Sequence, residues 1–181
     1  MRALILVAIA CGGIGCARGA ANVPTTAYQP TDARLFDHSV DFVETPVIVE
    51  GEWRGAFEQR VVRADLIAAV RVESSVAETV KRQSALRIAV RVTDRLKGES
   101  TRNIELRVDD TQASFSTVED HEQRILNERW IAFIKWEAVE GAAPIPHWHL
   151  SPDTAEVRAK IDYLLSSPPP DPNTQVEVIA P

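Results

Sequence analysis

Three segments in the middle of the chain alternate apolar and polar side chains with a period of two. In residues 66–73, 86–93 and 104–109, apolar residues occupy every second position and Arg or Glu residues stand at several positions between them. Successive side chains of a β-strand point to opposite faces, so each segment has one apolar and one charged face. Three strands with one solvent-exposed face are typical of an antiparallel sheet, and the pattern therefore predicts a mainly β domain.

Three further segments complete the predicted sheet. Residues 130–136 are apolar at both parities, so we expect a central strand that is covered on both sides. Residues 46–53 predict an earlier strand with Pro46 at its edge, and residues 147–150 predict a last short strand. We expect about five strands in an antiparallel barrel or a small sandwich.

Helices are expected at a few places only. Asp153 and Glu156 have the spacing of a capping box and begin a C-terminal amphipathic helix. A shorter helix is predicted over residues 118–126, while residues 54–64 fit either a helix or a loop. Apolar residues at helical spacing predict that one side of the C-terminal helix packs on the sheet: Val157, Ile161, Leu164 and Leu165.

The first residues have the layout of an export signal. Arg2 precedes an apolar run over residues 3–10, and small residues follow. The uncharged stretch, residues 3–17, is shorter than the roughly 20 apolar residues that a spanning helix needs. We therefore expect a cleaved signal, and a buried N-terminal helix of a cytoplasmic protein is the alternative.

Residues 13–16, Gly-Ile-Gly-Cys, resemble the lipobox of bacterial lipoproteins. The resemblance implies that the thiol of Cys16 carries a diacylglycerol after the signal is removed. Cys11 fits the same loose pattern but would leave a shorter apolar run before it. Because Ala17 is not acidic, the resemblance implies the outer membrane of the cell envelope. Cleavage after Ala21 is the alternative and would release a soluble periplasmic or secreted protein.

These observations divide the chain into four parts. They are a signal peptide over residues 1–15, a flexible tether over 16–36, a single β-rich domain over 37–165 and a Pro-rich disordered tail over 166–181. The chain has two Cys residues, both before position 17, so the domain has no disulfide and no thiol nucleophile.

The order of the predicted elements from residue 60 to 140 resembles that of netrin-like and tissue-inhibitor-of-metalloproteinase domains. The resemblance rests on the Leu-Lys-Gly turn at residues 96–98 and on residues 127–133, Asn-Glu-Arg-Trp-Ile-Ala-Phe, which follow a short helix. It implies an OB-like five-stranded barrel. The Cys-x-Cys segment with which the animal inhibitors chelate zinc has no counterpart in the domain, so the resemblance implies the fold and not the inhibition.

The histidines suggest one candidate chemistry. His147 and His149 are two positions apart, so in a strand they share a face and supply half of a zinc or copper site. A third ligand such as His121 or His38 would have to come from elsewhere. Since Trp148 lies between them and is expected in the core, both histidines are also expected to face solvent.

A hydrolase is a second hypothesis. Asp120 and His121 are adjacent, and Ser114 or Ser116 would supply the nucleophile of a triad. No G-x-S-x-G turn accompanies them. Such residues also occur by chance in any acidic loop.

Two further groups of side chains suggest binding. The charged strand face carries Arg87, Arg91 and Arg107 beside Glu73 and Glu105, which predicts cross-strand ion pairs, with an anion site as the alternative. The four Trp residues are expected in the core, and a groove for a glycan or a peptide is the alternative: Trp53, Trp130, Trp136 and Trp148.

The net charge of −6 gives no electrostatic attraction to nucleic acid. No sequence pattern calls for a cofactor. The sequence thus predicts an exported, lipid-anchored envelope protein with a non-catalytic binding or structural role and a protein or glycan partner that its residues do not identify. The alternatives are a metal-binding protein that uses His147 and His149, and a hydrolase built around Asp120 and His121.

Overall fold

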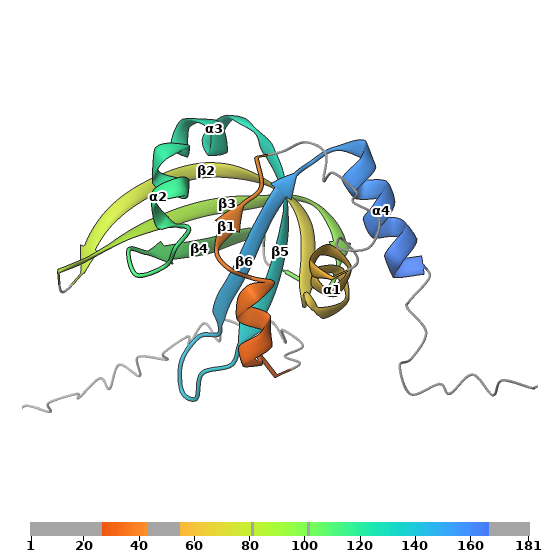
Figure 1. Ribbon diagram of the computed structural model, residues 1–181, viewed down its shortest axis with the longest axis horizontal. Helices are drawn as coiled ribbons and strands as arrows, with labels where there is room; N and C mark the ends of the chain where they lie inside the picture. Colours follow the sequence, from red (N-terminus) through yellow and green to blue (C-terminus); the bar gives the residue numbers. More distant parts are fainter. Residues whose placement is uncertain (1–26, 43–54, 81, 101, 167–181) are drawn as a thin grey trace, which may run out of the picture.

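A curled sheet of six strands, with helices against both of its faces, makes up the fold (Figure 1). The computed structural model describes residues 27–42, 55–80, 82–100 and 102–166. No helix in these ranges is long and apolar enough to cross a membrane. The elements in chain order are η1 (Pro30–Arg34), β1 (Ser39–Val40), α1 (Ala56–Arg63), β2 (Leu66–Val80), β3 (Gln83–Lys97), β4 (Asn103–Asp109), α2 (Phe115–Asp120), α3 (Glu122–Asn127), β5 (Arg129–Glu137), β6 (Ile145–Pro152) and α4 (Ala155–Ser166).

The strand order is β1-β6-β5-β2-β3-β4, and every neighbouring pair is antiparallel except β1 with β6. The mainly β class is therefore confirmed. The five-stranded antiparallel OB-like barrel is not: the described sheet has six strands, is mixed, and shows no pairing between β1 and β4. The parallel strand is added by the two-residue β1, and the strand expected at residues 46–53 lies outside the described residues.

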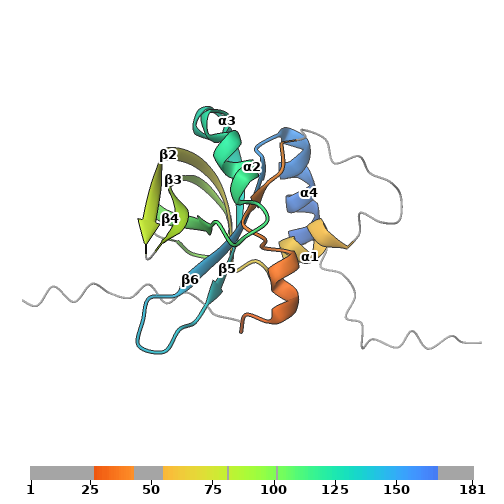
Figure 2. The same ribbon diagram turned by 60° about the vertical axis from the view of Figure 1, so that its left-hand side comes forward.

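The sheet curls strongly along β2 and β3. Their pairing shifts register at three places, after Ile67, Ala69 and Val72, and such irregularities bend and twist a strand pair. The curl carries β4 round toward β6, where Trp148 Nε1 donates to the carbonyl oxygen of Arg107 at 2.9 Å. Figure 2 shows β2–β4 on one side of β5 and β6, with α1 and α4 on the other.

Both sheet faces are apolar and covered, which gives the domain two cores. On β5, Trp130, Ala132 and Ile134 point into the inner core, inside the curl, while Ile131 and Phe133 point into the outer core. The prediction that this strand is central and covered on both sides is confirmed.

Different helices cover the two cores. The short helices α2 and α3 add one buried residue each to the inner core, whereas α1 and α4 lie against the outer core. The buried apolar residues of α1–α4 are Val118 and Ile125 on the inner side, and Phe57, Val61, Val157, Ile161 and Leu164 on the outer side.

Two details of the helices differ from expectation. The helix predicted over residues 118–126 is two helices, because the backbone leaves the helical region at His121 (φ −111°, ψ 18°). In α4, Thr154 is the capping residue instead of Asp153: its Oγ1 accepts from the amide of Val157 at 3.3 Å, while the Asp153 carboxylate binds Arg158. Leu165, expected in the packed stripe, is exposed.

The folded part begins earlier than predicted. Residues 30–36, assigned above to the flexible tether 16–36, form η1 and the turn after it, and Asp32, Leu35 and Phe36 are buried. The Pro-rich composition suggested an extended tether, but the two apolar side chains join the outer core and Asp32 forms an ion pair with Arg63. The domain boundaries of 37–165 thus become 30–166 in the described structure, and residues 167–181 lie outside it.

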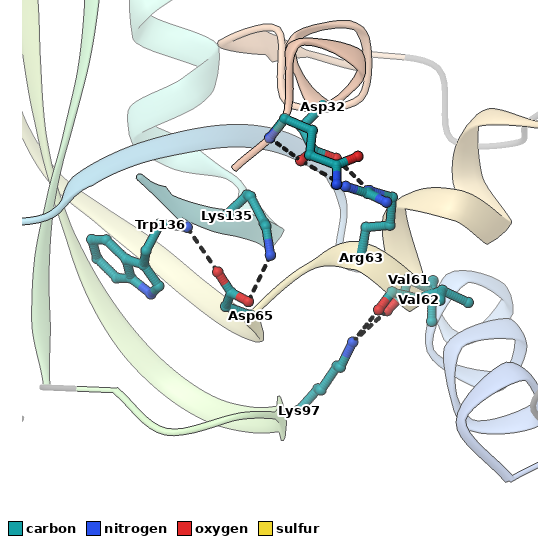
Figure 3. Close-up of polar contacts among 9 residues, drawn as sticks. Asp32, Val61, Val62, Arg63, Asp65, Lys97, Lys135 and Trp136 are labelled. Carbon is teal, nitrogen blue, oxygen red and sulfur yellow. Dashed lines mark hydrogen bonds and ion pairs between the residues drawn. The ribbon is translucent and has the colours of Figure 1, made fainter. Parts of the chain in front are cut away.

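Buried charges join α1 to the sheet (Figure 3). Asp65, just after α1, accepts from Lys135 Nζ at 2.9 Å and from the amide of Trp136 at 3.0 Å. Lys97 Nζ donates to the carbonyl oxygens of Val61 and Val62 in the last turn of α1, at 2.9 and 2.7 Å. Burial lowers the pKa of Lys97. Because carbonyl groups at a helix C-terminus lack helical partners, Lys97 satisfies two of them.

The ion pair between Asp65 and Lys135 generates a stability prediction. The two side chains are 5% and 1% exposed, so Asp65→Ala leaves a buried ammonium without this carboxylate. We expect a loss of about 3–5 kcal/mol in the free energy of unfolding, measured by urea denaturation. The added substitution Lys135→Met should recover most of that loss.

The control is Glu105→Gln, which removes the exposed carboxylate that Arg87 contacts at 3.7 Å. It should change the free energy of unfolding by less than about 1 kcal/mol. An equal effect of Asp65→Ala and Glu105→Gln would contradict a stabilising role of the buried pair.

Candidate functional site

The two histidines of β6 share one face of the strand, as the sequence predicted, with Trp148 and Leu150 on the other face in the inner core. Their exposure differs from the expectation that both face solvent. The His147 side chain is 17% exposed, but that of His149 is only 3% exposed. His149 is covered by residues 37–41, which run alongside β6 and include β1.

His149 lies between two carboxylates. Its Nδ1 is 3.0 Å from Asp37 Oδ1, and its Nε2 is 2.8 Å from Asp41 Oδ2. Carboxylate oxygens accept hydrogen bonds and do not donate them, so each ring nitrogen contributes an N–H. Both ring nitrogens of His149 therefore lie within hydrogen-bond distance of a carboxylate.

The same contacts set the charge of the acids. Burial alone would raise the pKa of Asp37, but hydrogen bonds from His149 and Ser39 and the positive charges of His149 and Arg60 lower it to about 2. The pKa of Asp41 is likewise lowered, because His149 and Arg60 outweigh burial. Arg60 is itself buried and donates from Nε to the carbonyl oxygen of Leu35 at 2.7 Å.

His147 belongs to a second, separate chain of contacts. Its Nε2 is 2.8 Å from Glu137 Oε2 and its Nδ1 is 3.2 Å from Nε2 of His38. The ring of Tyr28 stacks on it with centroids 4.0 Å apart. Burial lowers the pKa of His38, which favours a neutral ring there and leaves a nitrogen able to accept a hydrogen bond.

The structure does not bring His147 and His149 to a common point. One ring contacts Glu137 and His38, and the other contacts Asp37 and Asp41. Within residues 27–42, 55–80, 82–100 and 102–166, no group of three or more His, Cys, Asp or Glu side chains is arranged to hold a metal ion. Metal binding by the two histidines stays a prediction from the sequence.

The residues of the hydrolase hypothesis have other partners. Nδ1 of His121 donates to the carbonyl oxygen of Thr117 at 2.9 Å, and its ring lies 4.6 Å from that of Phe42. Ser114 Oγ donates to the carbonyl oxygen of Asp37 at 3.2 Å. Asp120 and Ser116 are exposed on α2. In the described structure these side chains do not form a relay.

A different set of Ser, His and Asp residues does meet, and sequence reasoning missed it. Ser39 Oγ lies 3.1 Å from His149 Nδ1 and donates to Asp37 Oδ1 at 2.6 Å. Both ring nitrogens of His149 face carboxylates, so neither is a free acceptor for the Ser39 proton, as a general base requires. The set is therefore suited to holding residues 37–41 on β6. No short sequence motif predicts this set of residues, since 110 residues separate Ser39 from His149.

The outer face of the sheet contains a polar cleft of about 460 Å³, which we call the arginine cleft. Arg71 on β2 and Arg129 on β5 stand directly opposite each other in the strand register, and Arg158 of α4 lies beside them. The residues that line the cleft are Arg71, Thr93, Asp94, Asn127, Glu128, Arg129, Asp153 and Arg158.

The Trp residues do not line such a cleft. Trp130 and Trp148 are fully buried in the inner core, and their indole N–H groups donate to the carbonyl oxygens of Ile125 and Arg107 at 3.0 and 2.9 Å. Trp136 packs against the same core, and Trp53 lies outside the described residues.

Comparison of the chain with protein-family models, curated proteins and solved structures finds no match. Its function is therefore inferred from its own residues.

The cluster around His149 generates a pH prediction. The pKa of Asp37 is about 2 in the folded chain and about 3.9 in an unfolded one, so its charged form stabilises the fold above pH 4. This contribution is lost as the pH falls from 4 toward 2. Because the side chain is 44% exposed, we expect Asp37→Asn to cost about 1 kcal/mol at pH 7 and almost nothing at pH 2.

The measurement is urea denaturation of both chains at the two pH values. Asp162→Asn, which removes an exposed carboxylate of α4, is the control and should change the free energy of unfolding by less than about 0.5 kcal/mol at either pH. A cost of Asp37→Asn that is the same at pH 2 and pH 7 would refute the assigned charge state.

Proposed function

We propose that this chain is an exported bacterial lipoprotein whose domain is a non-catalytic binding module of the cell envelope. The observation that carries the proposal is the N-terminal sequence, in which Arg2, an apolar run and small residues precede Cys16. A diacylglycerol on that thiol, together with further acylation, would hold the mature chain firmly on a membrane. Ala17 favours the outer membrane, with a soluble exported protein as the alternative.

The attachment of residues 35–42 to the domain supports this proposal. We call these residues the N-terminal strap. The amide of His38 donates to the carbonyl oxygen of Trp148, and that of Asp41 to the carbonyl oxygen of Leu150, both at 2.8 Å. The carboxylates of the strap also hold His149. A force that the tether applies to the strap would therefore act on β6. This strand lies inside the sheet, between β1 and β5.

Binding suits the described side chains better than catalysis. In the Ser39, His149 and Asp37 set both imidazole nitrogens lie against carboxylates, whereas the arginine cleft is open and lined mostly by charged side chains. The OB-like resemblance is part of the proposal, because OB-type barrels bind ligands across a strand face. The curl that carries β4 toward β6 is in keeping with it.

The proposal predicts lipidation at one thiol. In a Gram-negative host, we expect the chain to lose residues 1–15 and to appear by mass spectrometry with an acylated Cys16 at its N-terminus. Cys16→Ser should abolish incorporation of labelled palmitate and leave the protein unable to sediment with membranes. Both effects follow from the loss of the acceptor thiol.

The matched control is Cys11→Ser, which should leave labelling and sedimentation unchanged. A mature chain that begins with a free Asn22 would contradict lipidation and support the soluble exported form. Labelling lost with Cys11→Ser and kept with Cys16→Ser would move the anchor to Cys11.

A further inference from the structure

We infer that the arginine cleft binds a phosphate monoester group of a small polar ligand, held by Arg71 and Arg129. The inference rests on the proposed function to the extent that it gives the binding module a ligand. It is carried by the register of β2 and β5, by the ion pairs around the cleft and by the size of the cleft.

The register places two positive charges face to face. Arg71 and Arg129 are direct partners in the antiparallel pair of β2 and β5. Side chains directly opposite have Cβ atoms about 4.5–5.5 Å apart, and like charges at such positions destabilise a sheet. In the described part of the chain, no carboxylate lies within ion-pair distance of either guanidinium. The pair therefore lowers the stability of the domain when no anion lies between the two side chains.

Other arginines on the strands differ in this respect. Arg91, which is the partner of Arg71 on β3, forms an ion pair with Glu73. Arg87 contacts Glu78 at 3.0 Å, and Arg107 contacts Asp109 at 2.9 Å. These are the ion pairs that the alternating strand pattern leads one to expect. In the described part of the chain Arg71, Arg129 and Arg95 on β3 form none, and of these three only Arg71 and Arg129 are direct cross-strand partners.

The acids of the cleft form ion pairs with other cations, and Asp94 and Asp153 share one of them, Arg158. Arg158 Nη1 lies 2.7 Å from Asp94 Oδ2, and its Nη2 donates to Asp153 Oδ2 at 3.0 Å. Glu128 accepts from Arg124 Nε at 2.8 Å. The hydrogen bond and charge of Arg158 lower the pKa of Asp94, which stays ionised and bound. Arg71 and Arg129 are thus the two charged groups of the cleft that can bind an anionic ligand.

A phosphate monoester matches the two guanidinium groups in charge and in geometry. It carries a charge of about −1.5 to −2 at pH 7 and three acceptor oxygens, whereas a carboxylate carries a single charge. Two guanidinium groups present forked N–H donors that bind phosphate oxygens in pairs. A phosphate between them would also relieve their repulsion.

The cleft limits the ligand to a small one. Its volume of about 460 Å³ falls within the range of roughly 300–1,000 Å³ that is usual for small-molecule sites. The chain carries a net charge of −6, and Asp94, Glu128 and Asp153 stand around the arginines. A long polyanion would be repelled by these acids. A single phosphate on a sugar or glycerol unit fits, with hydroxyl groups placed to donate to the acids.

The test is an NMR titration of the arginine Nε–Hε signals of the full chain with inorganic phosphate and with glycerol 3-phosphate, at constant ionic strength. We expect saturable shifts for Arg71 and Arg129 and tighter binding of glycerol 3-phosphate. Acetate should bind at least about tenfold more weakly, since it pairs with one charge only. Affinity should fall between pH 7.5 and 5.5, because the second pKa of a phosphate monoester is about 6.

Three variants make the test specific. Arg71→Gln and Arg129→Gln should each weaken phosphate binding by about tenfold or more, a loss of about 1.4 kcal/mol. Arg87→Gln removes the same charge from a neighbouring strand outside the cleft and should leave the affinity within about twofold. Both cleft variants should melt at or above the temperature of the unchanged protein, since each removes a like-charge contact.

Equal weakening by Arg87→Gln, or shifts that do not saturate, would overturn the inference. Acetate binding as tightly as phosphate would replace the phosphate by a carboxylate ligand and overturn it as well. Failure here does not touch the lipid anchor, because acylation of Cys16 is measured on its own. A soluble mature chain that binds phosphate would conversely refute the anchor and leave the cleft intact.

Discussion

The architecture depends on a single constraint, namely that β5 is apolar on both faces from Trp130 to Ile134. Trp130 and Ile134 point to one side of the sheet and Ile131 and Phe133 to the other, and all four are fully buried. Apolar surface on both sides of a strand must be removed from water twice, so the sheet needs a cover on each face. On the outer side α1 and α4 supply it. On the inner side the sheet itself supplies most of it by curling until β4 approaches β6, with α2 and α3 across the opening.

The curl and the helices have to meet, and a few charged residues make that junction. Lys97, at the end of β3, binds the last carbonyl groups of α1, and the next residue must let the chain turn away at once. Gly98 does so with φ +76°, and a Cβ there would lie 1.9 Å from the carbonyl oxygen of Asp65. A side chain would thus displace the residue that binds Lys135. The Leu-Lys-Gly turn has a physical reason in this chain that is independent of any resemblance.

What the sequence predicts well is what its local pattern determines. Residues 66–73, 86–93, 104–109 and 130–136 all lie in strands, because alternation or continuous apolar character is a property of the segment itself. Features that depend on contacts between distant residues were not predicted from the sequence. β1 has two residues and no pattern, and it is a strand only because β6 lies beside it. The burial of His149 has the same origin: its parity was predictable, but the carboxylates that cover it come from residues 37 and 41. The composition of residues 30–36 also gave a wrong prediction. These residues were expected in a flexible tether, but Pro30 begins the short helix η1.

The arginine cleft lies where the helical cover of the outer face ends. Going along β2 and β5, the cross-strand partners on this face are Ile67 with Phe133, then Ala69 with Ile131, and then Arg71 with Arg129. The first two pairs lie beneath the helices in the outer core. The third pair lies beside Arg158, which is in the first turn of α4. Helix α4 has 12 residues and is about 18 Å long, so it does not cover the part of the sheet that lies beyond its N-terminus. Two apolar side chains at this position would be exposed to solvent. An Arg with a Glu would form an ion pair, as Arg91 and Glu73 do. Two arginines do neither, and a bound anion is the arrangement that accounts for both of them.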